Sequence, residues 1–175
     1  VSLIQSNFHG IGSRIGVGSY GFFLHNRGCG FNLIQKHPNM IHPGKKPLHT
    51  LSPTIWSKDN ELEFIVGTRG GRYQPQLLAQ HILPYILEKS SFEEIVKKPR
   101  WSIEYFGSNT DSEIKFEFIE ESVKNSLVSK GHRVTVEEKL VKSYGPISTI
   151  YKNQSGNFIG VPDIRVGTEK AFNNS

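Results

Sequence analysis

The sequence feature that most constrains this chain is a glycine-rich joint at residues 65–75, IVGTRGGRYQP, between an apolar run and a helical pattern. Three glycines fall within five residues there, so several backbone N–H groups stand at a helix start without side chains to cover them. Such amides attract negative charge, because the unpaired N–H groups and the helix dipole point the same way. The joint is compatible with a phosphate site, an oxyanion hole or a mere tight turn. It is not a P-loop, since GxxxxGK followed by Ser or Thr is absent.

The segments around this joint predict extended structure and one long loop. Residues 1–7 and 22–25 are apolar runs on either side of the glycine-punctuated FHGIGSRIGVGSYG, and they predict a strand and a hairpin-like partner. Residues 27–47 are rich in Gly, Pro, His, Asn and Lys without periodicity, which is typical of a long ordered loop with a function. Residues 51–56 and 61–66 flank the polar turn SKDN and predict an antiparallel hairpin whose two strands are both buried.

Helical signals follow the joint. Residues 76–89 carry leucines and isoleucines at helical spacing, and Pro84 is expected to kink this helix. Ser91 begins a capping box, SFEE, that predicts a short second helix ended by Pro99. The last third of the chain predicts one more helix, with Gly131 as its left-handed cap, among several strands. These elements are the helix at residues 121–130 and strands at residues 114–118, 132–138, 148–151 and 157–161. The fold class is therefore α+β.

Size and composition restrict the class of protein. A length of 175 residues predicts a single domain over residues 1–175. The formal net charge is +5, and we interpret the basic residues as scattered among the 16 acidic ones without forming a stripe. The basic pairs at 45–46 and 97–98 have no aromatic residues interleaved with them, so no nucleic-acid partner is expected. No run of about 18 apolar residues is present, so no membrane span is expected. The compartment is left unknown.

Metal and redox chemistry have little support in the sequence. The single cysteine, Cys29, excludes an internal disulfide and a CxxC metal site. His37 and His42 lie in the long loop without the spacing of metal ligands on a helix. We therefore expect no metal and no cofactor.

Several motifs, in one order along the chain, resemble a known family. They read GFFLHNRGCGF, PGKKPLHTLSPTI, GTRGG, KGHRV and PDIRVGTEKAF, and together they extend over almost the whole chain. This set resembles the small subunit of the gamma-glutamyltransferase (gamma-glutamyltranspeptidase) family, which carries PGKRPLSSMSPT, a strand hairpin and GSPGG. Several long motifs in the right order are far more specific than the glycine joint alone.

The resemblance implies an N-terminal nucleophile hydrolase with an αββα sandwich, of which this chain is the small-subunit part. In that family a precursor cuts itself, and the new N-terminal Thr supplies the hydroxyl nucleophile while its α-amine acts as the base. The match to the family's motifs implies that this Thr lies upstream of Val1, on a strand that the chain does not contain. The missing initiator Met and the apparent strand at residues 1–7 likewise predict a start further upstream. The implied partners are the large subunit of the same precursor, in a heterodimer or a larger assembly, and a small-molecule γ-glutamyl or related amide. No cofactor is implied.

Matching the motifs position by position implies roles for individual residues. Gly70 and Gly71 fall on the glycine pair whose amides form the family's oxyanion hole. Ser6 falls where the family has a Thr whose hydroxyl touches the nucleophile, although a strand-end hydroxyl without a catalytic role is an equal alternative. His49 and Thr50 fall on the Ser-Ser pair that helps to bind the substrate α-carboxylate.

Other positions depart from the family pattern. Phe8 falls on the family's substrate-binding Asn, and the adjacent Asn7 is a second candidate for that role. The Gln and Asp that grip the substrate α-amino group correspond here to Arg27 and Gly30. An Arg at this place repels an ammonium and attracts a carboxylate. A glutaryl (cephalosporin-type) acylase of the same fold is therefore the nearest alternative to a γ-glutamyltransferase.

Two further features bear on the alternatives. Asp163 and Arg165 match a DPR-like element near the end of the family's small subunit, and we expect them to form a structural ion pair with no catalytic role. A non-catalytic binding module that kept the scaffold is the alternative from a different class of protein. The residue at the natural processing site decides between that module and an enzyme.

Overall fold

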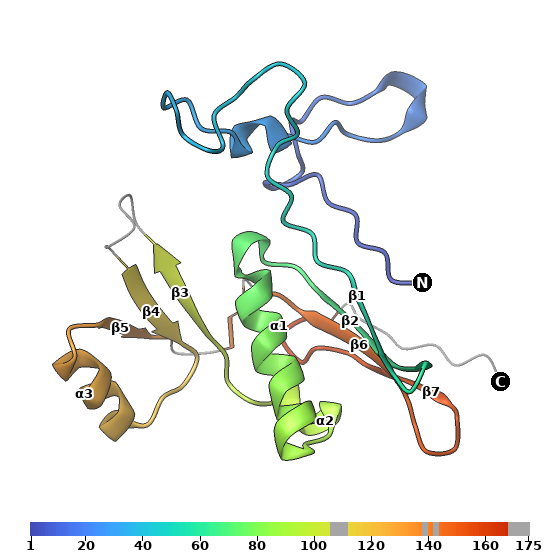
Figure 1. Ribbon diagram of the computed structural model, residues 1–175, viewed down its shortest axis with the longest axis vertical. Coiled ribbons are helices and arrows are strands. Elements are labelled where there is room, and N and C mark those ends of the chain that lie inside the picture. Colours follow the sequence, from blue (N-terminus) through green and yellow to red (C-terminus); the bar gives the residue numbers. More distant parts are fainter. Residues whose placement is uncertain (106–111, 138–139, 142–143, 168–175) are drawn as a thin grey trace. The chain divides into compact units, whose positions relative to one another are not determined.

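The computed structural model describes the chain except for residues 106–111, 138–139, 142–143 and 168–175 (Figure 1). It divides into two compact units: an N-terminal unit, Leu3–Leu51, and a C-terminal unit, Ser52–Ser175 together with Val1–Ser2. Each unit is described by itself. The single domain expected over residues 1–175 stays a prediction.

The larger sheet of the C-terminal unit contains four antiparallel strands in the order β1-β2-β6-β7. The strands are β1 (Thr54–Lys58), β2 (Glu61–Thr68), β6 (Ile147–Lys152) and β7 (Phe158–Val161). The predicted hairpin is confirmed, and its turn residues Asp59 and Asn60 both have positive φ, as a two-residue type I′ turn requires. The prediction that both strands are buried is wrong for β1, whose residues after Thr54 are all exposed, because β1 is an edge strand.

The core forms where the helices pack on this sheet (Figure 1). Helix α1 (Gln74–Leu83) has Pro75 in its first turn, where the missing N–H costs no helical hydrogen bond. At Pro84 the α-helix passes into a single π turn, η4 (Pro84–Glu88), which ends at the left-handed Lys89, and the kink expected at Pro84 stays a prediction. The capping box at Ser91 is confirmed and begins α2 (Phe92–Ile95). The core consists of Phe64, Val66, Leu77, Leu78, Ile82, Phe92, Ile95, Val96, Tyr144, Ile147 and Val161.

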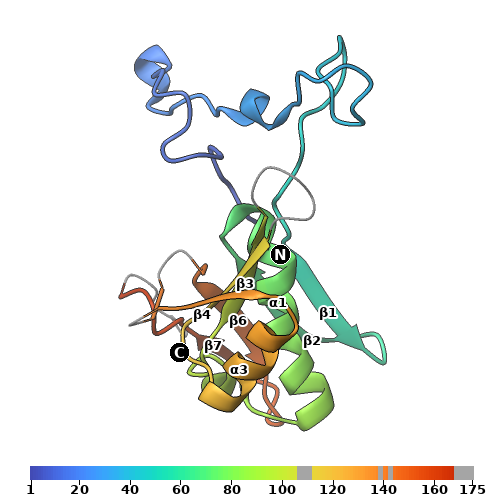
Figure 2. The same ribbon diagram turned by 90° about the vertical axis from the view of Figure 1, so that its left-hand side faces the viewer.

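A second, three-stranded sheet completes this unit. It contains β3 (Trp101–Tyr105), β4 (Ser112–Phe116) and β5 (Arg133–Val136), with β4 antiparallel to β3 and parallel to β5. Helix α3 (Glu121–Ser129) makes the crossover that a parallel pair needs (Figure 2). Gly131 follows the helix with φ of 87°, which confirms the predicted left-handed cap. The sequence prediction missed β3.

The N-terminal unit consists of turns and loops held by hydrogen bonds. Its regular pieces are two 3-10 turns, η1 (Gly18–Tyr20) and η2 (Arg27–Gly30), and isolated bridges at Gly16–Phe23 and Asn32–Met40. The predicted strand at residues 1–7 is wrong: no described strand pairs with it, and an apolar run forms a strand only when a partner takes up its backbone groups. The irregular loop predicted at residues 27–47 is confirmed.

Candidate active site

The glycine joint forms an open turn between β2 and α1. The ladder from β2 to β6 ends at the pair of Thr68 and Ile147, before the glycines are reached. Gly70 has φ of 127° and Gly71 has φ of 57°, two conformations that residues with a Cβ rarely adopt. No hydrogen bond from the Gly70 or Gly71 amide to another described residue is present, and the Gly70 carbonyl accepts one from the Tyr73 N–H at 3.0 Å.

Space around the second glycine is free within this unit. Gly71 is exposed, and a Cβ built on it meets nothing within 4 Å. Two adjacent amides that make no ladder hydrogen bonds, one of them with open space around it, suit the binding of a negatively charged oxygen.

A further glycine, Gly145, which the sequence interpretation missed, packs against the chain at the end of β2. Gly145 has φ of 56°, and a Cβ on it would lie 1.9 Å from the Arg69 carbonyl oxygen and 2.6 Å from Thr68 Oγ1. The backbone at residue 145 therefore packs directly on the chain that leads into the joint. Thr68 Oγ1 also lies 3.1 Å from the Pro146 carbonyl oxygen, so both sides of this contact are held.

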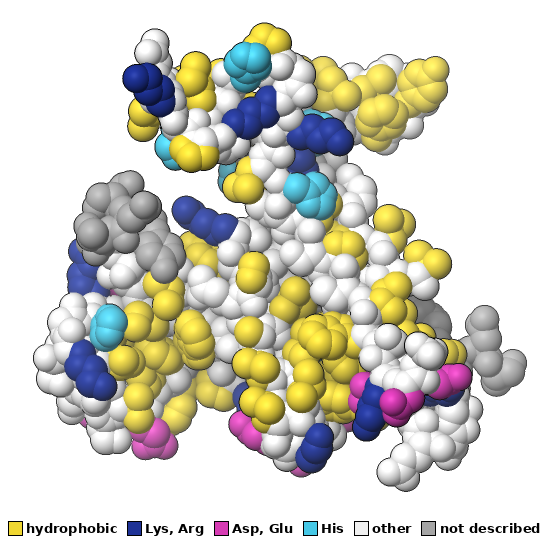
Figure 3. Space-filling view, viewed as in Figure 1, with side chains coloured by type: hydrophobic (Ala, Val, Ile, Leu, Met, Phe, Trp, Pro, Cys, Tyr) yellow, Lys and Arg dark blue, Asp and Glu magenta, His cyan; other side chains and the backbone are white. Residues whose placement is uncertain are grey.

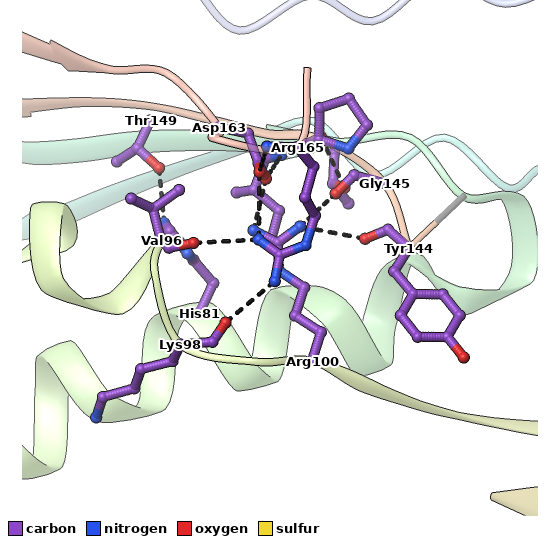
Figure 4. A network of polar contacts seen from close by, with 12 residues as sticks. His81, Val96, Lys98, Arg100, Tyr144, Gly145, Thr149, Asp163 and Arg165 are labelled. Atoms are coloured by element: carbon purple, nitrogen blue, oxygen red, sulfur yellow. Dashed lines mark hydrogen bonds and ion pairs between the residues drawn. The ribbon is translucent and has the colours of Figure 1, made fainter. Parts of the chain in front are cut away.

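An arginine behind the joint fixes the Gly145 segment. Arg100 Nη1 donates to the carbonyl oxygens of Tyr144, at 3.2 Å, and of Gly145 (Figure 4). Arg100 Nη2 donates to Asp163 Oδ2 at 2.6 Å, and the same oxygen accepts the Ile147 N–H at 2.8 Å. The Arg100 guanidinium thus ties the segment before β6 to the C-terminal residues.

A second arginine extends this buried network. Arg165 Nε donates to Glu117 Oε1 at 2.7 Å, and Arg165 Nη1 lies 3.3 Å from Asp163 Oδ1. The Arg165 guanidinium also donates to the carbonyl oxygens of Val96 and Lys98, each at 3.1 Å (Figure 4). The predicted ion pair between Asp163 and Arg165 is confirmed, and it belongs to a set of two guanidinium groups and two carboxylates, all buried.

The carboxylates of this network are held in their charged form. Burial alone raises the pKa of the Asp163 carboxyl, but the Arg165 main-chain N–H and the Arg100 charge outweigh it and hold that pKa below its usual range. The same balance applies to Glu117, where burial raises the pKa, and the hydrogen bonds from Arg165 together with those from the Val141 and Arg100 main-chain N–H groups hold it below its usual range. This network is therefore structural at neutral pH, with every charge matched.

One buried histidine lies in the same unit. His81 is 2% exposed, and its Nε2 lies 2.8 Å from Thr149 Oγ1. Burial, followed by the positive charge of Arg100, lowers the pKa of His81 to about 4. His81 is therefore neutral near pH 7 and packs as a core residue, stacked against Phe92 at 5.3 Å between ring centroids.

The N-terminal unit brings two of the predicted substrate-binding residues together. Arg27 is 8% exposed, and its Nη1 donates to Thr50 Oγ1 at 3.4 Å. Its guanidinium carbon lies 5.0 Å from the centroid of the Phe8 ring. Arg27 Nη2 is buried and has no hydrogen-bond partner in the part of the chain that the structure describes.

Asn26, which the sequence interpretation did not single out, fixes the backbone next to Arg27. Its Oδ1 accepts the His9 N–H at 2.9 Å, and its Nδ2 donates to the carbonyl oxygens of His9, at 3.0 Å, and Gly12, at 3.1 Å. Its own N–H donates to the Asn7 carbonyl at 3.1 Å. The turn at residues 7–12 and the 3-10 turn at Arg27 are therefore joined.

The other predicted site residues of this unit bind their own neighbours or face solvent. Ser6 Oγ accepts the Phe8 N–H at 3.0 Å, so this hydroxyl closes a turn and does not end a strand. Asn7 Oδ1 accepts a hydrogen bond from Gln5 at 3.1 Å. His49 is exposed. Gly70 and Gly71 belong to the other unit.

Charge is divided sharply between the two parts of the sequence, so the interpretation of scattered basic residues is wrong. Residues 1–51 contain five basic residues and no Asp or Glu, whereas the remaining 16 basic residues are matched by all 16 acidic ones. The face of the N-terminal unit shown in Figure 3 accordingly carries Lys, Arg and His side chains and no acidic ones. The whole formal charge of +5 therefore belongs to residues 1–51. These five are Arg14, Arg27, Lys36, Lys45 and Lys46.

The described residues contain neither a metal-binding cluster nor a membrane-spanning helix. No group of three or more His, Cys, Asp or Glu side chains in the described ranges is placed to hold a metal ion. Among the helices that the structure describes, none is both long and apolar enough to cross a membrane.

Comparison with known proteins gave consistent results. The family model described as Gamma-glutamyltranspeptidase matches residues 1–172. The chain is 31% identical over 167 residues to an oxamate amidohydrolase proenzyme of Klebsiella pneumoniae and 29% identical over 171 residues to the glutathione hydrolase-like YwrD proenzyme of Bacillus subtilis. Each alignment includes 94% of this chain, but only 31% and 32% of the respective relative. The chain thus spans about a third of the length of these curated relatives.

A solved structure shows the same fold. The T380A mutant of the Helicobacter pylori gamma-glutamyltranspeptidase superposes with a TM-score of 0.78, at 24% identity, over 95% of this chain and 93% of that one. This likeness confirms that the chain has the fold of the corresponding part of that protein, in agreement with the predicted α+β class.

Proposed function

The chain belongs to the gamma-glutamyltranspeptidase family, and from this membership we propose that it supplies part of the active site for acyl transfer or hydrolysis at a γ-glutamyl or related amide. The observation that carries the proposal is the pair of amides at Gly70 and Gly71, which lie beyond the β2 ladder and donate no hydrogen bond to another described residue. Phosphate binding, the other role open to such a joint, has no support from the family.

The proposed reaction proceeds through an acyl-enzyme. The hydroxyl oxygen of an N-terminal Thr, upstream of Val1, attacks the amide carbon, its proton passes to the α-amine, and the carbonyl oxygen becomes negatively charged. The Gly70 and Gly71 amides donate to this oxygen, and one such donor is worth about 3 to 4 kcal/mol of transition-state stabilisation. The C–N bond then breaks as the leaving amine takes the proton, and water or an amino acid later accepts the acyl group.

Processing and a second subunit belong to the same proposal. Both relatives named above are called proenzymes, which supports maturation of a longer precursor by cleavage. The large subunit of that precursor would supply the rest of the active site. In this scheme Thr50, His49 and Asn7 contact the substrate, and Ser6 lies near the nucleophile.

The names of the two relatives define the range of substrates to test. Glutathione contains a γ-glutamyl amide with a free α-carboxylate, and oxamate is an amide with a free carboxylate beside it. The property that these two molecules share is a carboxylate near the scissile amide. We therefore propose an amide of this kind as the substrate.

The experiment tests the glycine joint in the complete, processed protein. Gly71→Ala is compared with Gly131→Ala, since both glycines have positive φ, are exposed and have open space around a Cβ. The strain of about 1 to 2 kcal/mol is thus shared, and only Gly71 faces the proposed oxyanion. We expect p-nitroaniline release from γ-glutamyl- and glutaryl-p-nitroanilide to fall about 100-fold in Gly71→Ala alone. Equal activity in the two variants would refute the assignment.

A further inference from the structure

The direction of each amide in the glycine joint depends on the carbonyl group of its own peptide unit. A peptide unit is planar and trans, so its N–H and its C=O point in opposite directions. The Gly70 N–H shares a peptide unit with the Arg69 carbonyl, and the Gly71 N–H shares one with the Gly70 carbonyl. Whatever holds these two carbonyl groups therefore also sets the directions of the two N–H groups.

Both carbonyl groups have a hydrogen-bond donor within the C-terminal unit. The Gly70 carbonyl accepts the Tyr73 N–H at 3.0 Å. The Arg69 carbonyl lies 2.9 Å from the hydroxyl oxygen of Thr68, which is the last residue of β2 and is 5% exposed. Thr68 Oγ1 also lies 3.1 Å from the Pro146 carbonyl, so its one hydroxyl proton serves two carbonyl oxygens. A single buried hydroxyl thus links the joint to the chain before β6.

A braced stretch of main chain also restricts the Arg69 carbonyl. A Cβ on Gly145 would lie 1.9 Å from the Arg69 carbonyl oxygen, so this oxygen has no room to move toward residue 145. The Gly145 carbonyl in turn accepts a hydrogen bond from the buried Arg100, which is paired with Asp163 (Figure 4). A hydrogen bond and a steric contact therefore both limit rotation of the peptide unit that carries the Gly70 N–H.

We propose that Thr68 is a positioning residue of the proposed acyl transfer: its hydroxyl holds the Arg69 carbonyl and thereby aims the Gly70 N–H at the carbonyl oxygen under attack. The inference rests on the proposed function, because it states how one donor of that site is oriented. Thr68 itself touches no reacting atom. Donors that are aimed in advance stabilise a developing charge without first reorienting, and a misplacement of about 1 Å can slow a reaction about 100-fold.

Thr149 provides a matched control for Thr68. It is a buried threonine of the same four-stranded sheet, and its Oγ1 lies 2.8 Å from His81 Nε2, so this hydroxyl contacts a core side chain and not the joint. Thr68→Val and Thr149→Val each remove one buried hydroxyl and keep a branched side chain of similar size. We expect the two variants to lose similar amounts of stability, as measured by their midpoints of denaturant unfolding.

The activities of the two variants should differ. The substrate is whichever of γ-glutamyl- and glutaryl-p-nitroanilide the complete, processed wild type cleaves faster, and rates are expressed per processed molecule. We expect Thr68→Val to lower kcat about 10- to 100-fold and to change KM less than about 3-fold, because the misaimed donor acts on a charge that exists only during the reaction. Thr68→Ser, which keeps the hydroxyl, and Thr149→Val should both stay within about 3-fold of the wild type.

A double variant tests whether Thr68 acts through the glycine joint. Gly71→Ala disturbs the proposed oxyanion site, so the Thr68 hydroxyl then has little function left to support. Thr68→Val is expected to lower kcat/KM less than about 3-fold in the Gly71→Ala background, compared with about 10- to 100-fold in the wild-type background. The same large loss in both backgrounds would mean that the hydroxyl acts elsewhere, and the positioning role would be wrong.

The outcomes distinguish this inference from the proposed function. If Gly71→Ala is as active as Gly131→Ala, the oxyanion assignment itself fails. If Gly71→Ala loses activity while Thr68→Val remains as active as Thr149→Val, the positioning role of Thr68 is refuted and the oxyanion assignment stands. A Thr68→Ser variant as slow as Thr68→Val would also refute it, because the hydroxyl would not be the group that matters. So would a loss of activity that accompanies a much lower midpoint of unfolding than that of Thr149→Val.

Discussion

The two units of this chain treat a buried arginine in opposite ways. In the C-terminal unit Arg100 and Arg165 share two buried carboxylates, Asp163 and Glu117, and each guanidinium also donates to main-chain carbonyls. In the N-terminal unit Arg27 has one long contact with a hydroxyl and an unpaired Nη2. A guanidinium with matched carboxylates is part of a structural framework, whereas Arg27 is a buried charge that has no carboxylate partner among the described residues of its unit.

The same contrast extends to backbone and composition. The C-terminal unit is built from strands and helices around one apolar core and has balanced charge, and its network supports the segment that packs behind the glycine joint. The N-terminal unit is built from turns and carries the whole formal charge of +5. Regular secondary structure with balanced charge and irregular turns with an excess of positive charge therefore occupy two separate stretches of one sequence.

The largest effect is expected where a framework charge loses its partner. Asp163→Ala leaves Arg100 and Arg165 short of a buried carboxylate, and we expect the free energy of unfolding of the complete protein to fall by about 3 to 5 kcal/mol. Denaturant unfolding measures this change. The control is Glu88→Ala, which breaks the exposed ion pair with Lys98 and should leave the denaturant concentration at the midpoint of unfolding unchanged. Similar midpoints for the two variants would contradict the framework role.

A pH titration of stability sharpens the account of the same unit. His81 has its pKa lowered by burial to about 4, so the unfolded chain binds this proton more readily than the folded one. The contribution of His81 is fully present above about pH 6.5 and is lost as the pH falls from there to about 4, with a total of about 3 kcal/mol at most. His81→Gln should reduce the dependence of the unfolding free energy on pH over that range, whereas a change at the exposed His132, His132→Gln, should not. Parallel curves for wild type and His81→Gln would contradict it.

A smaller effect on stability is expected from the capping box at Ser91 in the C-terminal unit. Ser91 Oγ accepts the Glu94 N–H at 3.3 Å, and the Glu94 carboxylate accepts the Ser91 N–H at 3.0 Å. Ser91→Ala removes one half of this capping box and should lower the free energy of unfolding by about 1 kcal/mol. Ser90→Ala is the neighbouring control, since among the described residues its hydroxyl makes one long, exposed contact, with Glu88 at 3.4 Å. Equal losses would show that the cap contributes nothing.

The smallest change in stability is expected from the unpaired arginine. Arg27→Met keeps the side-chain volume and removes a buried charge without stranding a carboxylate, so the unfolding free energy without ligand should stay level or rise by about 1 kcal/mol. Arg100→Met, in contrast, strands Asp163 and should destabilise the protein. Calorimetry of both variants makes the comparison. A large loss in Arg27→Met would mean that Arg27 belongs to a framework after all.

Local signals made most of the C-terminal unit predictable from sequence. The hairpin through Asp59 and Asn60, the capping box at Ser91 and the cap at Gly131 each depend on a few neighbouring residues, and all three are confirmed. Strand β3 was missed because WSIEY is short and its pairing with β4 depends on residues beyond it. The strand expected at residues 1–7 failed for the converse reason, since no described partner takes up its backbone.

The candidate site was predictable only in part. The open turn at Gly70 and Gly71 follows from the local run of glycines, and the structure bears out its geometry. The contact of Arg27 with Thr50 joins residues far apart in the loop, and the close approach of Gly145 to Arg69 joins the segment before β6 to the residue after β2, so neither follows from spacing. The charge division was visible in the sequence, but a count over the whole chain concealed it.

The most direct test is a crystal structure of the complete, processed protein with a glutaryl group trapped on its nucleophile. We expect the carbonyl oxygen of the trapped group to lie about 2.7 to 3.1 Å from the main-chain nitrogens of both Gly70 and Gly71. An acyl oxygen that instead contacts other donors, with these two amides turned away from it, would contradict the central claim.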